Sequence, residues 1–166
     1  MRYSNQETKN LATFIGYPES LEDINTIISR DGCLEAMPFF INEEVVIDMD
    51  CVEKKIARSE GRCNNKSMDS AFVALDADGN CSIVFVEYRF NYQSMKNLRA
   101  KDLRGKKKFS HKNLVDLGVT NFHNKYYYIF NDNLKEQARR YFRSLYPSMP
   151  NNFIPLTIID LKTIFF

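Results

Sequence analysis

Apolar and polar positions in the first sixty residues alternate with the spacing of amphipathic helices. A first helix is predicted over residues 20–31, because Ser20 can cap its N-terminus and Gly32 can end it. Its apolar face would comprise Leu21, Ile24, Ile27 and Ile28. A second helix is predicted from a cap at Asn42 to Gly61, with an apolar face of Val45, Val46, Met49, Val52 and Ile56.

A period of two replaces the helical period in the middle of the chain. Residues 72–75 and 83–90 are rich in β-branched and aromatic side chains, and the intervening Asp78-Gly79 suits a hairpin turn. On the second strand one face must carry Ile83, Phe85, Glu87 and Arg89. That face is apolar at one end and charged at the other, which fits a strand that runs from a core into a cleft. The alternative is an edge strand whose charged residues lie in solvent.

The second half of the chain continues the alternation of helices and strands. Further elements are expected as helices over 94–104, 110–117 and 134–145, a strand over 125–130, and a last strand with an apolar terminus within 153–166. Gly105 is predicted to end the first of these helices. The order predicts one mixed α/β domain over residues 1–166, with a small central sheet that contains a β-hairpin and is flanked by helices.

The net charge of +2 hides a strong segregation of charge. Residues 19–60 carry eleven acidic and four basic side chains, whereas residues 89–112 carry nine basic side chains and one acidic. Clustered cations are what a surface that binds nucleic acid needs. The candidate nucleic-acid-binding residues are Lys96, Arg99, Lys101, Arg104, Lys106, Lys107, Lys108 and Lys112. The alternative is that the basic run is a solvated loop.

Composition also limits where the protein is expected to act. No stretch approaches the roughly 20 apolar residues that cross a bilayer, and residues 1–7 lack the apolar core of a secretion signal. The cysteines are widely spaced, which favours neither a zinc site nor a disulfide framework. We therefore expect a cytoplasmic protein with reduced thiols and no membrane partner.

Two acids stand at one end of the predicted hairpin. Asp69 precedes the first strand and Glu87 lies on the second, so the hairpin can bring them together, with Arg89 two residues beyond. Magnesium prefers hard oxygen ligands and keeps several waters, so two carboxylates and a substrate phosphate suffice to hold it. The sequence therefore predicts a divalent-metal site for cleaving phosphodiesters, with Asp69, Glu87 and Arg89 as candidate catalytic residues.

The pattern Asp69 … Glu87-Tyr88-Arg89, within the order helix, hairpin, helix, strand, helix, resembles the PD-(D/E)XK nuclease-like superfamily over roughly residues 43–145. The resemblance implies a restriction-endonuclease-like fold and a Mg²⁺ or Mn²⁺ cofactor. It further implies that Asp69, Glu87 and the Tyr88 carbonyl are metal ligands. Arg89 stands where the family has a lysine that orients or deprotonates the attacking water.

Three features depart from the family pattern. Arg89 keeps its charge at any ordinary pH and cannot act as a base, although it can stabilise a charged phosphate. No strand is evident before Asp69, because residues 61–67 are short and polar. Met68 precedes Asp69 where the family name has a proline, a position that varies widely in the family. Apart from these departures, the helical glutamate that some members use has four candidates, Glu35, Glu43, Glu44 and Glu60.

Three hypotheses of function follow. The first is a metal-dependent endonuclease that acts on DNA or RNA. The second is a nuclease-like module that binds nucleic acid without cleaving it, because Arg89 replaces the lysine. The third is a structural or protein-interaction protein, in which the acidic first third pairs with the basic middle in a homodimer or a larger complex.

Overall fold

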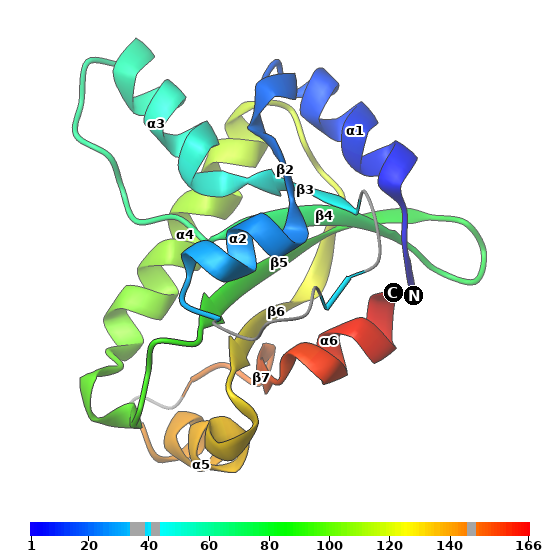
Figure 1. Cartoon of the computed structure of the whole chain (residues 1–166). Helices are drawn as coiled ribbons and strands as arrows, with labels where there is room; N and C mark the ends of the chain where they lie inside the picture. The colour runs from blue at the N-terminus through cyan, green and yellow to red at the C-terminus, as the bar shows by residue number, and fades with distance from the viewer. Residues whose placement is uncertain (34–38, 41–43, 146–148) are drawn as a thin grey trace.

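The computed structural model describes residues 1–33, 39–40, 44–145 and 149–166. Within these residues it contains a seven-stranded open sheet flanked by six α-helices (Figure 1). The strands are β1 (Arg2–Tyr3), β2 (Leu21–Asp23), β3 (Val45–Asp48), β4 (Ser70–Leu75), β5 (Cys81–Arg89), β6 (Phe122–Phe130) and β7 (Phe153–Leu156). The helices are α1 (Asn5–Phe14), α2 (Ile24–Arg30), α3 (Met49–Ser59), α4 (Ala100–Asp116), α5 (Lys135–Ser144) and α6 (Ile158–Phe165). Short 3₁₀ turns are η1 (Pro18–Ser20), η2 (Met95–Asn97) and η3 (Asp132–Leu134).

The sheet is mixed, with the strand order β2-β3-β4-β5-β6-β7 and β1 paired to β4. Strands β2 to β5 pair antiparallel, and β4 and β5 form the predicted hairpin. Strand β6 then runs parallel to β5, and β7 runs parallel to β6. The mixed α/β class is thereby confirmed. Because β5 lies between β4 and β6, the edge-strand alternative for its charged residues is wrong.

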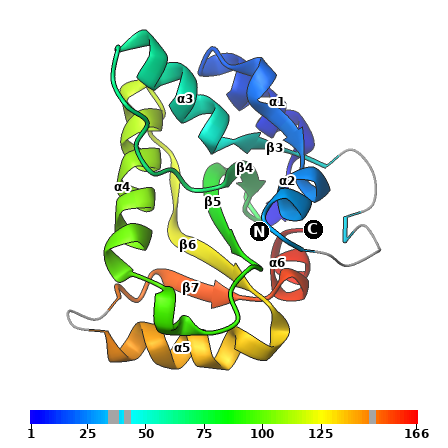
Figure 2. The same cartoon turned by 60° about the vertical axis from the view of Figure 1, so that its left-hand side comes forward.

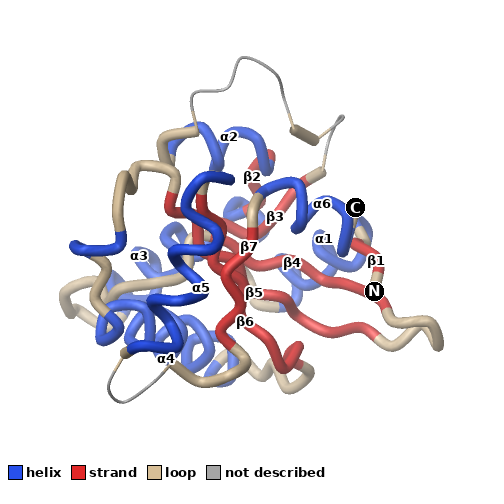
Figure 3. Tube along the Cα trace, turned by 90° about the horizontal axis from the view of Figure 1, so that it is seen from below, coloured by secondary structure: helices blue, strands red, loops and turns tan. Residues whose placement is uncertain are grey.

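Helices cover both faces of the sheet, so the domain has three layers (Figures 1 and 3). One core lies between the sheet and α1, α3, α4 and α5, and the other lies between the sheet and α2 and α6. Strand β5 alternates between them: Ile83 and Phe85 belong to the first core, and Val84 and Val86 belong to the second. The predicted alternation of β5 is confirmed. Figure 2 shows α3 and α4 together on the first face.

The helix predicted from Asn42 is wrong in its first part. Residues 45–48 form strand β3, since the β-branched Val-Val-Ile run favours an extended backbone. Helix α3 begins only at Met49, where the carboxylate of Asp48 accepts a hydrogen bond from the Cys51 backbone at 2.9 Å. The predicted cap, Asn42, lies outside the described residues. Strand β3 pairs with β4 and is the strand before Asp69 that the sequence did not reveal.

The first predicted helix is also shorter than expected. Leu21–Asp23 pair with β3 as strand β2, and the carboxylate of Asp23 caps α2 by accepting from the Thr26 backbone at 3.0 Å. Ser20 belongs to η1 and does not cap the helix. Helix α1 was not anticipated at all.

Two boundaries in the second half differ from the prediction. Helix α4 runs unbroken through Gly105, because glycine inside a helix costs only about 1 kcal/mol and the flanking residues favour helix. The last strand ends at Leu156, and residues 158–165 form α6 behind a capping box of Thr157 and Asp160. The apolar terminus packs down as expected, with Phe165 only 2% exposed.

Candidate functional site

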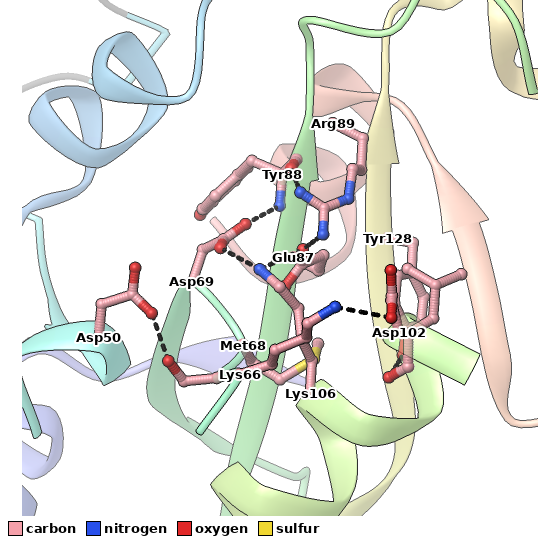
Figure 4. A network of polar contacts seen from close by, with 12 residues as sticks. Asp50, Lys66, Met68, Asp69, Glu87, Tyr88, Arg89, Asp102, Lys106 and Tyr128 are labelled. Atoms are coloured by element: carbon pink, nitrogen blue, oxygen red, sulfur yellow. Dashed lines mark hydrogen bonds and ion pairs between the residues drawn. The ribbon is translucent and has the colours of Figure 1, made fainter. Parts of the chain in front are cut away.

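The hairpin register brings the two predicted acids together. Ser70 pairs with Val86, so Asp69 and Glu87 are the next residues of the antiparallel pair, at the end of the hairpin opposite its turn. Strand β5 carries the side chain of Glu87 toward α4, beyond Ile83 and Phe85 on the same face. Figure 4 shows both carboxylates reaching toward one point between the strands and the helix.

The group at that point is the ammonium of Lys106, from helix α4. Its Nζ lies 3.0 Å from Asp69 Oδ1 and 2.7 Å from Glu87 Oε1. One cation therefore bridges two carboxylates that are eighteen residues apart in the sequence (Figure 4). The Lys106 side chain is only 16% exposed, so the bridge is largely shielded from water.

Arg89 is the second cation of the site. Its guanidinium forms an ion pair with Glu87, and its Nη1 donates to the Tyr88 carbonyl at 3.3 Å. It also lies over the Tyr92 ring, 5.6 Å from the centroid. Asp69, Glu87 and Arg89 thus meet in space as the sequence pattern predicted.

Tyr88 contributes its backbone to the site, and its ring lies elsewhere. The Tyr88 N–H donates to Asp69 Oδ2 at 2.6 Å, which fixes the carboxylate against β5. The ring points to the opposite face of the sheet, where its hydroxyl accepts from Ser70 Oγ at 3.3 Å. The predicted ligand atom, the Tyr88 carbonyl oxygen, belongs to the backbone of β5 and already accepts a hydrogen bond from Arg89.

Burial dominates the electrostatics of the acids. Glu87 is 0% exposed and Asp69 is 5% exposed. Burial, and then the negative charge of Asp69, raise the pKa of Glu87 well above its usual range, although Arg89 and Lys106 oppose the shift. Burial also lowers the pKa of Lys106, but the two carboxylates outweigh it and raise that pKa overall. Lys106 therefore stays charged at neutral pH.

A third acid, Asp31, lies close enough to Asp69 for the two carboxylates to interact electrostatically. Burial, followed by the negative charge of Asp69, raises the pKa of Asp31 to about 7. The following residue, Gly32, has φ +94° and would place a Cβ 1.9 Å from Asn91 Oδ1. A residue with a side chain would be strained at this φ and would displace the Asn91 side chain, so glycine lets the end of α2 lie close to the chain that leaves β5. No sequence signal distinguished Asp31 from other acids of the acidic first third.

The donor set suits a hard divalent cation. In the part of the chain that the structure describes, no group of three or more His, Cys, Asp or Glu side chains is placed to hold a metal. Two carboxylates with waters and a phosphate are nevertheless enough for Mg²⁺. Glu87 Oε2 is buried without a hydrogen-bond partner among the described residues, and the Lys106 ammonium stands as a positive charge between the two acids.

The other predicted nucleic-acid-binding residues lie mainly on the outside of α4 and before it. Exposed positions are taken by Lys96, Arg99, Lys101, Lys108 and Lys112. Arg104 is half-buried, and Lys107 lies over the Tyr126 ring at 4.8 Å from its centroid. The interpretation of this segment as a solvated loop is wrong, since it is helical.

Sequence reasoning placed Lys106 among surface cations and missed its position in the site. The signal was present: in an unbroken helix Leu103, Lys106 and Ser110 recur at helical spacing, and Leu103 and Ser110 are fully buried. The break predicted at Gly105 concealed it. Of the four candidate helical glutamates, Glu60 pairs with Arg62 at the end of α3, Glu44 is half-buried beside β3, and Glu35 and Glu43 lie outside the described residues.

Comparison with known proteins adds no relative: no family model, curated protein or solved structure matches this chain. Nor does the described part of the chain contain a helix with the length and apolarity that crossing a membrane requires. Its four cysteines form no disulfide.

Proposed function

We propose that the protein is a metal-dependent phosphodiesterase that cleaves DNA or RNA at the Asp69–Glu87 site. The observation that carries the proposal is the convergence of both carboxylates on one cation, beside Arg89, at the end of the hairpin. The order α3, β4–β5 hairpin, α4, β6, α5 also agrees with the resemblance to PD-(D/E)XK nucleases.

Asp69 and Glu87 would hold Mg²⁺ or Mn²⁺, with the Tyr88 carbonyl as a further oxygen ligand. When bound, such an ion supplies a more acidic water and offsets the charge that develops on phosphorus. The backbone of Tyr88 keeps Asp69 oriented toward Glu87 through its 2.6 Å hydrogen bond. These roles depend only on hard oxygen donors, which is the chemistry that both ions prefer.

Lys106 takes the place that the family pattern gives to the lysine after Glu87. It reaches the acids from α4, whereas Arg89 reaches Glu87 from β5 itself. Because the carboxylates raise its pKa, Lys106 acts as a charged donor that orients and stabilises the scissile phosphate. Arg89 holds Glu87 in place and adds a second permanent positive charge.

A second candidate function is the binding of nucleic acid without cleavage. One observation favours it: two acids are matched by two cations, so the site is balanced in charge without a metal. On this account Lys106 and Arg89 keep the acids neutralised permanently, and the exposed cations of α4 bind the phosphate backbone.

Plasmid nicking with Mg²⁺ or Mn²⁺ tests the first candidate. We expect Asp69→Asn and Glu87→Gln each to reduce cleavage at least about a hundredfold, whereas Asp78→Asn, at the exposed turn of the same hairpin, retains it. The metal should also raise the melting temperature of the native protein but not that of the two site variants. Undiminished cleavage in both variants would overturn the assignment, and binding with no cleavage under either metal would favour the second candidate.

A further inference from the structure

A hollow of about 340 Å³ lies between η2 and α5, apart from the acidic site. Its lining comprises Met95, Lys96, Gln137, Arg140, Tyr141 and Ser144. It brings together two cations that are more than forty residues apart in sequence, one from each element. None of the residues predicted to act in catalysis lines it.

The two cations of the hollow have no acidic partner. Lys96 and Arg140 are exposed, and neither side chain forms an ion pair or hydrogen bond with a described residue. Their neighbours on α5 differ, because Arg139 pairs with Glu136 and Lys135 pairs with Asp160. Two like charges left side by side repel each other unless an anion lies between them.

The floor of the hollow is apolar and fixed. Met95 is 3% exposed, and the Tyr141 hydroxyl donates to the Leu98 carbonyl, which ties α5 to the segment before α4. The half-buried Tyr141 ring presents a surface on which a nucleobase can pack. The cations at the rim can bind the phosphate of a nucleotide, and the apolar floor can contact its base.

The hollow also lies next to the proposed site along the chain. Strand β5 ends at Arg89, and the segment that follows it leads directly to η2 beside α5 (Figure 1). Arg89 contacts Tyr92 in that segment, which packs against the same core as Met95. The acidic site and the hollow are therefore joined by one short segment of the chain, residues 90–94.

We propose that this hollow binds one unpaired nucleotide of the substrate strand, with its phosphate between Lys96 and Arg140 and its base against Tyr141. The inference rests on the proposed function for the identity of the substrate, but it concerns binding and not cleavage. It therefore gives the protein a second contact with nucleic acid, and a preference for unpaired strands.

Binding of a labelled oligothymidine of about 15 nucleotides, measured by fluorescence anisotropy in EDTA, tests the proposal without cleavage. We expect the Kd to rise about tenfold in Lys96→Ala/Arg140→Ala and the salt dependence to weaken. Gln137→Trp, which fills the hollow without changing charge, should also raise the Kd. The matched control is Lys9→Ala/Lys125→Ala, which removes two exposed cations on α1 and at the start of β6 and should bind as the native protein does.

Native affinity in Gln137→Trp, or equal losses in the two double variants, would overturn the inference, as would a blunt duplex that binds as tightly as the single strand. The result is separable from that for the catalytic site. Loss of binding in the hollow variants would stand even if no metal supported cleavage, whereas metal-dependent cleavage with native oligonucleotide affinity in those variants would refute the hollow alone.

Discussion

Among the residues that the structure describes, the two most deeply buried glutamates have opposite surroundings. Glu53 on α3 and Glu87 on β5 are 1% and 0% exposed. Both oxygens of Glu53 are occupied: Oε1 accepts from Arg62 and from the Asn65 backbone, each at 2.5 Å, and Oε2 accepts from Asn113 at 2.7 Å. Glu87 instead meets two cations at Oε1 and leaves Oε2 without a hydrogen bond among the described residues.

The pKa values of the two carboxyls diverge accordingly. Burial raises the pKa of Glu53, but the hydrogen bonds from Arg62, Asn113 and the Asn65 backbone outweigh it and lower the pKa overall. For Glu87 burial prevails, and Asp69 adds to the shift in the same direction. Burial is common to both, so the difference comes from what surrounds each carboxyl: complete hydrogen bonding around one, and a second acid beside the other.

This contrast separates a cluster whose buried carboxylate is completely hydrogen-bonded from one whose buried carboxylate is not. The Glu53 cluster fastens the segment between α3 and β4, which also hydrogen-bonds to α4 where the Met68 N–H donates to Ser110 Oγ at 2.8 Å. Asp69 is the next residue after Met68. The Glu53 cluster thus helps to position Asp69. Helix α4 contributes a side chain to each place: Asn113 donates to Glu53, and Lys106 pairs with Asp69 and Glu87.

The largest effect that tests the comparison is a loss of stability. Glu53→Ala leaves Arg62 and Asn113 without their partner, and we expect it to lower the free energy of unfolding by about 3 kcal/mol. Urea denaturation measures the change. Glu60→Ala, which removes the exposed partner of Arg62, is the matched control and should cost less than about 0.5 kcal/mol. Equal costs would show that Glu53 has no special structural role.

Unlike Glu53→Ala, Glu87→Gln should raise the free energy of unfolding. Burial raises the pKa of Glu87 even with Arg89 and Lys106 beside it, so the fold favours the neutral carboxyl, and we expect a neutral isostere to increase the free energy of unfolding at pH 8. The loss of cleavage expected for the same variant would then accompany a protein that is at least as stable as the native one. A large loss of stability would place Glu87 in the same structural class as Glu53.

The pH dependence of the stability gain in Glu87→Gln tests whether the raised pKa of Glu87 causes it. The folded protein holds a proton on Glu87 above the ordinary glutamate pKa of about 4.3, so native stability falls as pH rises from there toward the raised pKa. The glutamine variant lacks this dependence, and its advantage should therefore shrink toward zero near pH 4. For Glu53, whose pKa is lowered, the stabilising contribution is present at neutral pH and is lost as pH falls through the lowered pKa.

Sequence patterns were sufficient where one periodicity governed a whole element. The alternation on β5 correctly placed Ile83 and Phe85 on the face that carries Glu87, and the hairpin register then brought Asp69 beside it. Both are local consequences of strand geometry. This is why the meeting of the two acids could be predicted without any relative.

Patterns failed where tertiary contacts decided the outcome. The apolar positions of residues 45–56 fit a helix, yet the first four pair with β2 and β4 as strand β3. The spacing of Lys106 with Leu103 and Ser110 indicates the inward face of α4, but its contact with the two acids depends on where α4 lies against the sheet. The hydrogen-bond donors around Glu53 come from two separate segments, the one between α3 and β4 and helix α4, so its cluster gave no sequence signal.

Gly105 is the residue at which the sequence prediction and the structure disagree most directly. It lies within α4, between the part of the helix that packs beside η2 and the part that carries Lys106 and Asn113, and an added Cβ would meet no atom within 4 Å. Gly105→Ala should therefore raise the free energy of unfolding by about 0.5–1 kcal/mol, because alanine favours the helix and restricts the unfolded chain. Urea denaturation of this variant beside Gly79→Ala, which should destabilise because Gly79 has φ +83°, measures the difference. Destabilisation by Gly105→Ala would mean that α4 is interrupted at this residue, and Lys106 would then not be held on the face that reaches the two acids.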